Sequence, residues 1–531
     1  MTSQAAAAVP DAPKAAPWVI APIVGLAAFM EVLDISIANV ALQHIAGNLS
    51  ASQDQSTWVL TSYLAANAIV LPMSGWIAST IGRRRYFLGC IIGFSITSLL
   101  CGLAPNLELL ILFRALQGAT GGGLQPNAQA ILADAFPPNK RGQAFAAFGI
   151  AVIVAPVIGP TVGGWITDSF SWRWVFLLNV PVGVIVSLLA ARVVVDPPER
   201  TAARLAQLVR GVRFDYIGFA LLVVGMCSLQ VVLDKGQQND WWASSLILDL
   251  GIAAVVSLVA FVVWELNRDD PVVDLRLLKN PNFAIGSLLM FMLGFILNSS
   301  TVLLPQFVQA LMGYTATDAG LVLSPGGLAA MFMMPIVGNL INRVDARWLI
   351  ATGLATTAFG LFYMTRFYLD VDYNTFAWAR IYQSVGLAFL FIPINTVAFI
   401  GVPLAKNNDA SALINMMRNL GGSFGISLAI TLLARRQQYH QSVLVEHVGS
   451  YSSQYHDTIQ RLQQAFLARS SSTVDALHHA QAMVYAMVQK QAALLSYIDT
   501  FWVLAIGFTA LVPLIFLLRK PTPGAGGPAG H

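Results

Sequence analysis

Two carboxylates interrupt a long apolar stretch near the start of the chain. The run from Trp18 to Leu42, WVIAPIVGLAAFMEVLDISIANVAL, is long and apolar enough to cross a bilayer as one helix, yet it contains Glu31 and Asp34. A carboxylate at mid-membrane costs about 2.5–3.5 kcal/mol on insertion scales, so each needs a partner, a water-filled cavity or a proton. Residues three or four apart share a helical face, which places Glu31, Asp34 and Gln43 on about one face.

Arg114 is the basic residue best placed to meet Asp34. Each lies about seven or eight residues in from the outer end of its apolar span, which puts both roughly 10–12 Å below the outer surface. An intramembrane arginine and aspartate at one depth should pair. Burial disfavours an ionised carboxylate and a nearby arginine favours it, so such a pair could load and release a proton. The alternative is a permanent ion pair that only fixes helix packing. Glu31, one turn deeper, is either a second titrating group or a contact for a cationic substrate.

The composition excludes a soluble protein. Of 531 residues, 56% are hydrophobic and only 11% are charged, whereas a soluble domain has about 25% charged residues. The three cysteines lie in apolar runs, which favours packing roles over disulfides. The first apolar run is longer than the roughly 7–15 residues of a signal peptide core, and we expect no cleavable signal. The chain is therefore predicted to be a polytopic membrane protein.

Fourteen apolar segments have about the length that a bilayer requires. Arginine and lysine concentrate in every second loop, so the bias of basic residues predicts that both chain termini are cytoplasmic. The expected spans are 18–42, 57–80, 86–104, 107–132, 142–166, 174–194, 215–234, 244–266, 282–308, 318–341, 348–368, 375–402, 409–434 and 497–518.

An internal repeat divides these spans into two halves. Pro72-Met-Ser-Gly75 recurs as Pro335-Ile-Val-Gly338, and Arg114-Ala-Leu-Gln117 recurs as Arg380-Ile-Tyr-Gln383. By the same spacing Asp34 falls near Asn298. Parallel six-span halves are a transporter architecture with the substrate site near the midplane. The predicted all-α organisation is a disordered tail (1–17), a six-helix bundle (18–194), a linker with two additional helices (195–280), a second bundle (281–519) and a second tail (520–531).

One outer segment, 435–496, is much longer than the other outer loops. It contains five of the seven histidines of the chain, without the tight spacing of metal ligands, so no metal site is expected. Leu462, Phe466 and Leu467 share a helical stripe, and so do Val484, Met487 and Val488. We expect two amphipathic helices outside the membrane. A solvated hairpin with no partner is the alternative.

Two glycine-containing motifs suggest close helix packing. GWIASTIGRRR (75–85) lies at an inner loop, where glycines allow close approach and arginines can anchor at the membrane face. APVIGPTVGG (155–164) combines small residues with prolines that kink a helix. Such a crossing could act as a hinge. The predicted conformational residues are Gly75, Gly82, Arg83, Arg84, Arg85, Pro156, Gly159, Pro160, Gly163 and Gly164.

These motifs carry a resemblance to a known family. GWIASTIGRRR, LFRALQG around Arg114 and APVIGPTVGG are similar to signature motifs of the major facilitator superfamily, the last to the motif of its antiporters. EVLDISIANVAL resembles the first-span motif of its fourteen-span drug:proton antiporters. The extra central pair, the long last outer loop and the glycine-rich tail resemble the EmrB branch of the EmrB/QacA group. Ser79 departs from the pattern, since the family usually has an acidic residue there, and the charge relay assigned to that residue cannot operate unaltered.

The resemblance implies a proton-driven exporter of hydrophobic drugs in the bacterial inner membrane, working with an EmrA-like membrane-fusion adaptor and a TolC-like outer-membrane channel. An exporter of one endogenous metabolite, such as a siderophore or fatty acid, is the first alternative, and a non-transporting scaffold or sensor is the second. No GxxxxGKS loop or catalytic constellation is present, so we expect a non-enzyme with no cofactor, driven by the proton gradient. Proton coupling is predicted at Asp34, Glu31 and Arg114, and polar substrate contacts at Asn39, Gln43, Gln125, Asn127, Asn298, Gln306, Arg380, Gln383 and Asn395.

Overall fold

The computed structural model describes residues 16–196, 215–268, 271–403, 406–448, 452–467 and 472–517, and these form helices with no strand among them. The predicted tails thus fall almost wholly outside the described residues, as do residues 197–214 and 269–270 of the predicted linker. The α-helices are α1 (Pro17–Asn48), α2 (Gln53–Ser56), α3 (Trp58–Ile81), α4 (Arg83–Leu103), α5 (Leu107–Gly121), α6 (Leu124–Ala135), α7 (Arg141–Ser169), α8 (Arg173–Leu177), α9 (Asn179–Val193), α11 (Tyr216–Lys235), α12 (Ser245–Leu266), α13 (Pro281–Met312), α14 (Ala316–Leu340), α15 (Ala346–Met364), α16 (Tyr373–Ala398), α17 (Asn407–Glu446), α18 (Ser453–Leu467) and α19 (Thr473–Thr509).

Within the described residues, eleven helices are long and apolar enough to cross a membrane. The count of fourteen spans stays a prediction. The expected span 107–132 is interrupted, because α5 ends at Gly121 and α6 begins at Leu124. The break lies at a run of glycines, where a Cβ on Gly123 would come within 2.7 Å of the Cys90 sulfur. Glycine permits this close approach at the cost of helix continuity.

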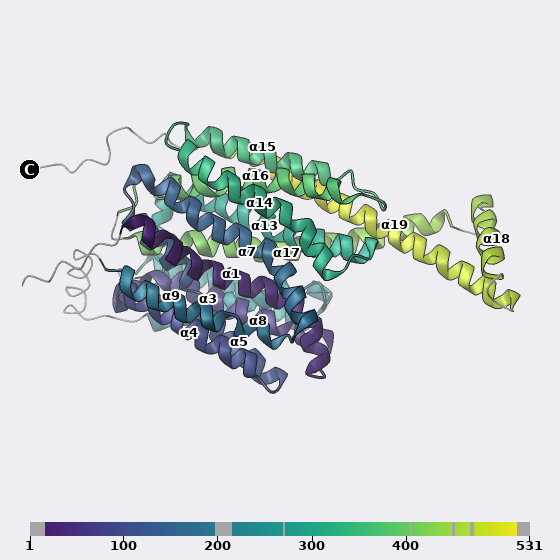
Figure 1. Ribbon diagram of the computed structural model, residues 1–531, viewed down its shortest axis with the longest axis horizontal. Helices are drawn as coiled ribbons and strands as arrows, with labels where there is room; N and C mark the ends of the chain where they lie inside the picture. The colour runs from purple at the N-terminus through teal and green to yellow at the C-terminus, as the bar shows by residue number, and fades with distance from the viewer. Residues whose placement is uncertain are drawn as a thin grey trace, which may run out of the picture.

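The two halves meet along α7 and α14, which lie side by side in Figure 1. A Cβ added at Gly142 would lie 3.1 Å from the Gly338 carbonyl, and one added at Gly327 would lie 2.6 Å from Val157. Small residues therefore let these helices approach closely at both ends of the contact. A second contact joins α3 to α17, and the additional helix α11 packs against α3.

The outer segment differs from its sequence-based prediction. α17 continues to Glu446 and α19 runs unbroken from Thr473 to Thr509, so the outer segment is largely an extension of two long helices, with only α18 separate. In Figure 1 these helices project beyond one end of the bundle. Ile459, Leu462 and Phe466 of α18 pack on Ala480 and Val484 of α19. Of the predicted apolar stripes, Leu462, Phe466 and Val484 thus pack inside the hairpin, whereas Leu467 and Met487 are exposed.

Candidate functional site

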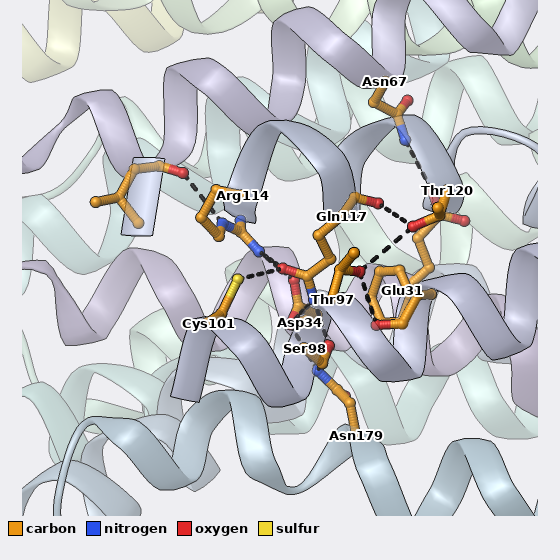
Figure 2. A network of polar contacts seen from close by, with 12 residues as sticks. Glu31, Asp34, Asn67, Thr97, Ser98, Cys101, Arg114, Gln117, Thr120 and Asn179 are labelled. Atoms are coloured by element: carbon orange, nitrogen blue, oxygen red, sulfur yellow. Dashed lines mark hydrogen bonds and ion pairs between the residues drawn. The ribbon is translucent and has the colours of Figure 1, made fainter. Parts of the chain in front are cut away.

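The predicted pairing of Arg114 with Asp34 is present in the structure. The Arg114 Nη1 atom lies 2.6 Å from Asp34 Oδ2, and both side chains are completely inaccessible to solvent (Figure 2). Arg114 Nε also donates to the Val59 carbonyl at 3.1 Å, and the guanidinium carbon lies 4.3 Å from the centre of the Tyr63 ring. The ion pair joins α1 to α5 and is fixed from α3.

Three neutral side chains that the sequence analysis did not predict complete this site. Asp34 Oδ1 accepts hydrogen bonds from Gln117 Nε2 at 3.0 Å and from Asn179 Nδ2 at 2.6 Å. Gln117 in turn accepts from Arg114 at 2.7 Å and donates to Ser98 at 2.5 Å. Gln117 belongs to the repeated Arg-Ala-Leu-Gln sequence, which is the signal that could have found it. Asn179 and Ser98 carry no such signal.

Glu31 is buried one turn away on α1. Asn67 on α3 donates to its Oε1 atom at 3.1 Å, and the Gln125 side chain is a second polar neighbour of the carboxylate. Arg418 on α17, in the second half, acts on Glu31 electrostatically and donates to Gln125, which the sequence analysis predicted. A carboxylate of the first half and a cation of the second half are thus close enough to interact electrostatically.

Buried amides form a second connection between the halves. Gln129 on α6 donates to Asn395 on α16 and accepts from Asn415 on α17 at 2.6 Å. Asn395 was predicted as a substrate contact, whereas Gln129 and Asn415 were not. All three side chains are buried. Any ligand between the halves at this level would have to exchange hydrogen bonds with these amides.

The second half contains a counterpart of the Arg114 site. Arg380 Nη1 donates to Gln383 at 2.6 Å, just as Arg114 donates to Gln117, and to Ser300 at 3.2 Å. Asn298, expected to be the counterpart of Asp34, instead donates to the Gly294 carbonyl of its own helix at 3.1 Å. Ser300, which lies two residues further along α13, therefore occupies the place of Asp34 opposite the arginine.

The remaining predicted substrate contacts lie away from these clusters. Asn39 and Gln306 are exposed, and Asn127 donates to the Gly123 carbonyl of its own helix at 2.7 Å. The structure does not describe the side chain of Gln43. The structure thus brings Gln125, Arg380, Gln383 and Asn395 into buried networks, and does not bring Asn39, Asn127 or Gln306 into them.

The arginine motif connects α3 and α4 to α6, α9 and α17. Gly82 has a φ of 102°, which glycine adopts without strain, and so α3 passes directly into α4. Arg83 pairs with Asp134 on α6, whose carboxylate also accepts from Asn407 on α17 at 2.6 Å. Arg84 donates to the Ala191 carbonyl at 2.5 Å, and Arg85 is exposed.

Acidic residues are present at this junction although position 79 is a serine. Ser79 donates to the Trp76 carbonyl of its own helix at 2.8 Å. A Cβ added at Gly75 would lie 2.9 Å from the Asp409 Cα, which places the first turn of α17 directly on α3. Asp134 and Asp409 thus place two carboxylates at this junction, and neither belongs to the motif at 75–85.

The proline and glycine motif of α7 packs on α1. Ser36 donates to the Pro156 carbonyl at 3.2 Å, and a Cβ on Gly163 would lie 3.2 Å from the Ile37 Cα. Gly159 also contacts Ser36. The motif therefore packs against the turn of α1 that follows Asp34. Its role as a hinge stays a prediction, as do the roles of Pro160 and Gly164.

Comparison with known proteins identifies the family. The sequence profile of the Major Facilitator Superfamily matches residues 24–426. The chain belongs to the major facilitator superfamily. Members of this superfamily are transporters rather than enzymes, and the many apolar helices agree with a multi-pass protein of the bacterial inner membrane.

Individual superfamily members match over nearly their whole length. The fatty acid resistance protein FarB of Neisseria gonorrhoeae is 38% identical, covering 96% of each chain. The multidrug export protein EmrB of Escherichia coli is 37% identical, covering 95% of this chain and 96% of its own. Among solved structures, the human organic anion transporter MFSD10 has a TM-score of 0.57 at 13% identity, covering 95% of this chain and 99% of its own, and this likeness shows the fold.

Proposed function

We propose that this protein is a proton-coupled exporter of hydrophobic and amphipathic drugs and the inner-membrane subunit of a tripartite pump. Its similarity to the multidrug export protein EmrB supports the substrate class. The observation that carries the coupling is the completely buried ion pair of Asp34 and Arg114. A buried carboxylate in a membrane helix is costly even when it is paired, and such residues are usually functional.

The hydrogen bonds of Asp34 explain how a proton could change the conformation. All three neighbours that contact its oxygens, Arg114, Gln117 and Asn179, donate hydrogen bonds to it. A protonated carboxyl is itself a donor and has lost its charge, so it matches this arrangement poorly. Protonation would therefore release α5 and α9 from α1. The glycine-rich segment of α7 packs on α1 beside Asp34, and α7 also contacts α14 of the second half. A movement of α1 could therefore be passed to the second half through α7.

Substrate binding would act on the contacts between the halves. Gln129 with Asn395 and Asn415, and Gln125 with Arg418, join the two bundles through buried side chains. A ligand that displaces these bonds would couple its own binding to the separation of the halves. Glu31 would contribute a second proton site or a contact for a cationic group, because it is a buried carboxylate next to this interface and interacts electrostatically with Arg418.

The projecting hairpin is the proposed contact for a periplasmic adaptor of the EmrA type. Since the α18 stripe packs inside the hairpin, the available apolar surface is on the outer part of α19, where Val474, Met483, Tyr485 and Met487 are exposed. An adaptor that binds here would connect this protein to a TolC-like outer-membrane channel.

Export of one metabolite class is the second candidate function. The similarity to the fatty acid resistance protein FarB favours it. A non-transporting scaffold would have no use for two buried carboxylates facing cations, and we set it aside.

Reconstitution into proteoliposomes with an imposed pH gradient tests the proposal. We expect uphill movement of a fluorescent hydrophobic dye that collapses when a protonophore dissipates the gradient. Dye movement that is unaffected by the protonophore would contradict proton coupling. Movement of a fatty acid but of no dye or drug would favour the metabolite exporter.

A further inference from the structure

The two halves of the protein use the same arginine and glutamine in different ways. Positions 114 and 380, 117 and 383, and 34 and 300 all differ by 266, and the residues at these positions contact one another in both halves. In the first half the arginine faces the carboxylate of Asp34. In the second half it faces the hydroxyl of Ser300. The fold therefore repeats the arginine and glutamine but replaces the carboxylate with a neutral group.

Arg380 has no counterion within the described residues. Its side chain is 1% exposed, and its partners Gln383, Ser300 and Thr301 are all neutral. No acidic group among the described residues acts on it electrostatically. Arginine stays charged inside proteins, and a buried charge without a partner is costly. Arg380 differs in this respect from its counterpart Arg114, which is paired with Asp34.

Donors around Arg380 are left unused. The Arg380 Nε atom and the Gln383 Nε2 atom are both buried and have no hydrogen-bond partner within the described part of the chain. In the first half the corresponding glutamine nitrogen donates to Asp34. The guanidinium fork and this amide together are a donor set suited to two carboxylate oxygens.

We propose that this Arg380 cluster, made of Arg380, Gln383, Ser300 and Thr301, binds the carboxylate of an amphipathic acid. The first half shows that the same arginine and glutamine receive a carboxylate. The ligand is amphipathic because the cluster lies within the apolar helices α13 and α16. Thr301, at the edge of the cluster, is partly exposed, so a ligand would approach from that side. That the bound acid is exported rests on the proposed transport function, whereas its binding does not.

Two nearly isosteric substitutions test this site in the full-length protein. Ser300→Asp places a carboxylate where Asp34 lies in the first half, and Ser300→Asn places a neutral amide of the same shape there. Radiolabelled dodecanoate binding is measured at equilibrium in lipid nanodiscs without a pH gradient, with Arg380→Gln discs as the background. Dodecan-1-ol and dodecyl phosphate serve as neutral and phosphate competitors.

We expect Ser300→Asp to weaken dodecanoate binding at least tenfold, because its own carboxylate neutralises Arg380. Ser300→Asn fills the same space without a charge, so it should weaken dodecanoate binding much less than Ser300→Asp does, and dodecan-1-ol should not compete. The thermal unfolding temperature of Ser300→Asp should equal or exceed that of Ser300→Asn, because Arg380 compensates the added charge. This comparison separates loss of the site from loss of the fold.

Three results would overturn the proposal. An equal loss of dodecanoate binding in Ser300→Asp and Ser300→Asn would mean that the larger side chain, and not its charge, disturbs binding. Unchanged binding in Ser300→Asp would mean that the acid binds elsewhere. Displacement of dodecanoate by dodecyl phosphate at much lower concentrations than by unlabelled dodecanoate would make the cluster a site for lipid phosphate. Because binding is measured without a gradient, failure of proton-coupled export would leave these outcomes unaffected.

Discussion

The Arg114 guanidinium and the Asp34 carboxylate lie 2.6 Å apart, although the two residues are 80 positions apart in the chain. Neither side chain is accessible to solvent. Within the described residues, the Asp34 carboxylate accepts hydrogen bonds from three side-chain donors, namely Arg114, Gln117 and Asn179. The site is therefore built for an ionised carboxylate, and a change in its protonation has structural consequences.

Asp34→Asn should abolish uphill transport, because an amide cannot exchange the proton. It should also destabilise the protein by roughly 3–5 kcal/mol, since Arg114 loses its counterion in a buried place. Gradient-driven dye efflux and thermal unfolding measure the two effects. The double variant Asp34→Asn/Arg114→Gln should recover part of the stability but none of the transport. Wild-type efflux in the single variant would remove Asp34 from the coupling mechanism.

Arg114→Ala should change the pH dependence of transport or abolish transport, because the group that favours the ionised form of Asp34 is gone. Arg114→Lys keeps the charge but cannot reproduce the contacts with Val59, Asp34 and Gln117 together, so partial activity is expected. Efflux measured across a series of internal and external pH values tests both variants. An unchanged profile for Arg114→Ala would show that the two groups do not act together.

A cross-link between Gln143 and Asn339 should stop transport. Their side chains join α7 to α14 across the two halves at 2.5 Å. In a background with Cys90, Cys101 and Cys227 replaced, oxidation of Gln143→Cys/Asn339→Cys should block efflux and reduction should restore it. Thr97→Cys/Thr120→Cys is the matched control, because these side chains lie 3.5 Å apart within the first half. Full efflux in the oxidised test pair would mean that α7 and α14 need not separate here.

Deletion of about residues 450–480 should leave drug binding in detergent intact and abolish both adaptor co-purification and drug resistance in cells. The finer test is Met483→Ser/Met487→Ser, because these exposed side chains lie outside the hairpin core. This pair should weaken adaptor binding without unfolding the hairpin. Retention of the adaptor by the deleted protein would place the docking surface elsewhere and make the hairpin a spacer or a gate.

The sequence by itself determined the membrane class, the two repeated halves and the pairing of Asp34 with Arg114. Composition and the lengths of apolar runs report the environment of each helix, and counting residues from a span end gives the depth of a side chain. Two opposite charges at the same depth in an apolar medium are expected to pair, because an unpaired charge there is costly. The repeated Arg-Ala-Leu-Gln sequence likewise placed Arg380 and Gln383 correctly in the second half.

The tertiary structure alone decided which neutral side chains complete each site. Depth does not fix the direction in which a residue points, and direction depends on how neighbouring helices cross. Asn179 therefore reaches Asp34, Arg418 faces Glu31 from the opposite half, and Ser300 rather than Asn298 stands before Arg380. The same limit applies to the hairpin, since an apolar stripe on α18 looks identical in sequence whether it packs on α19 or binds another protein.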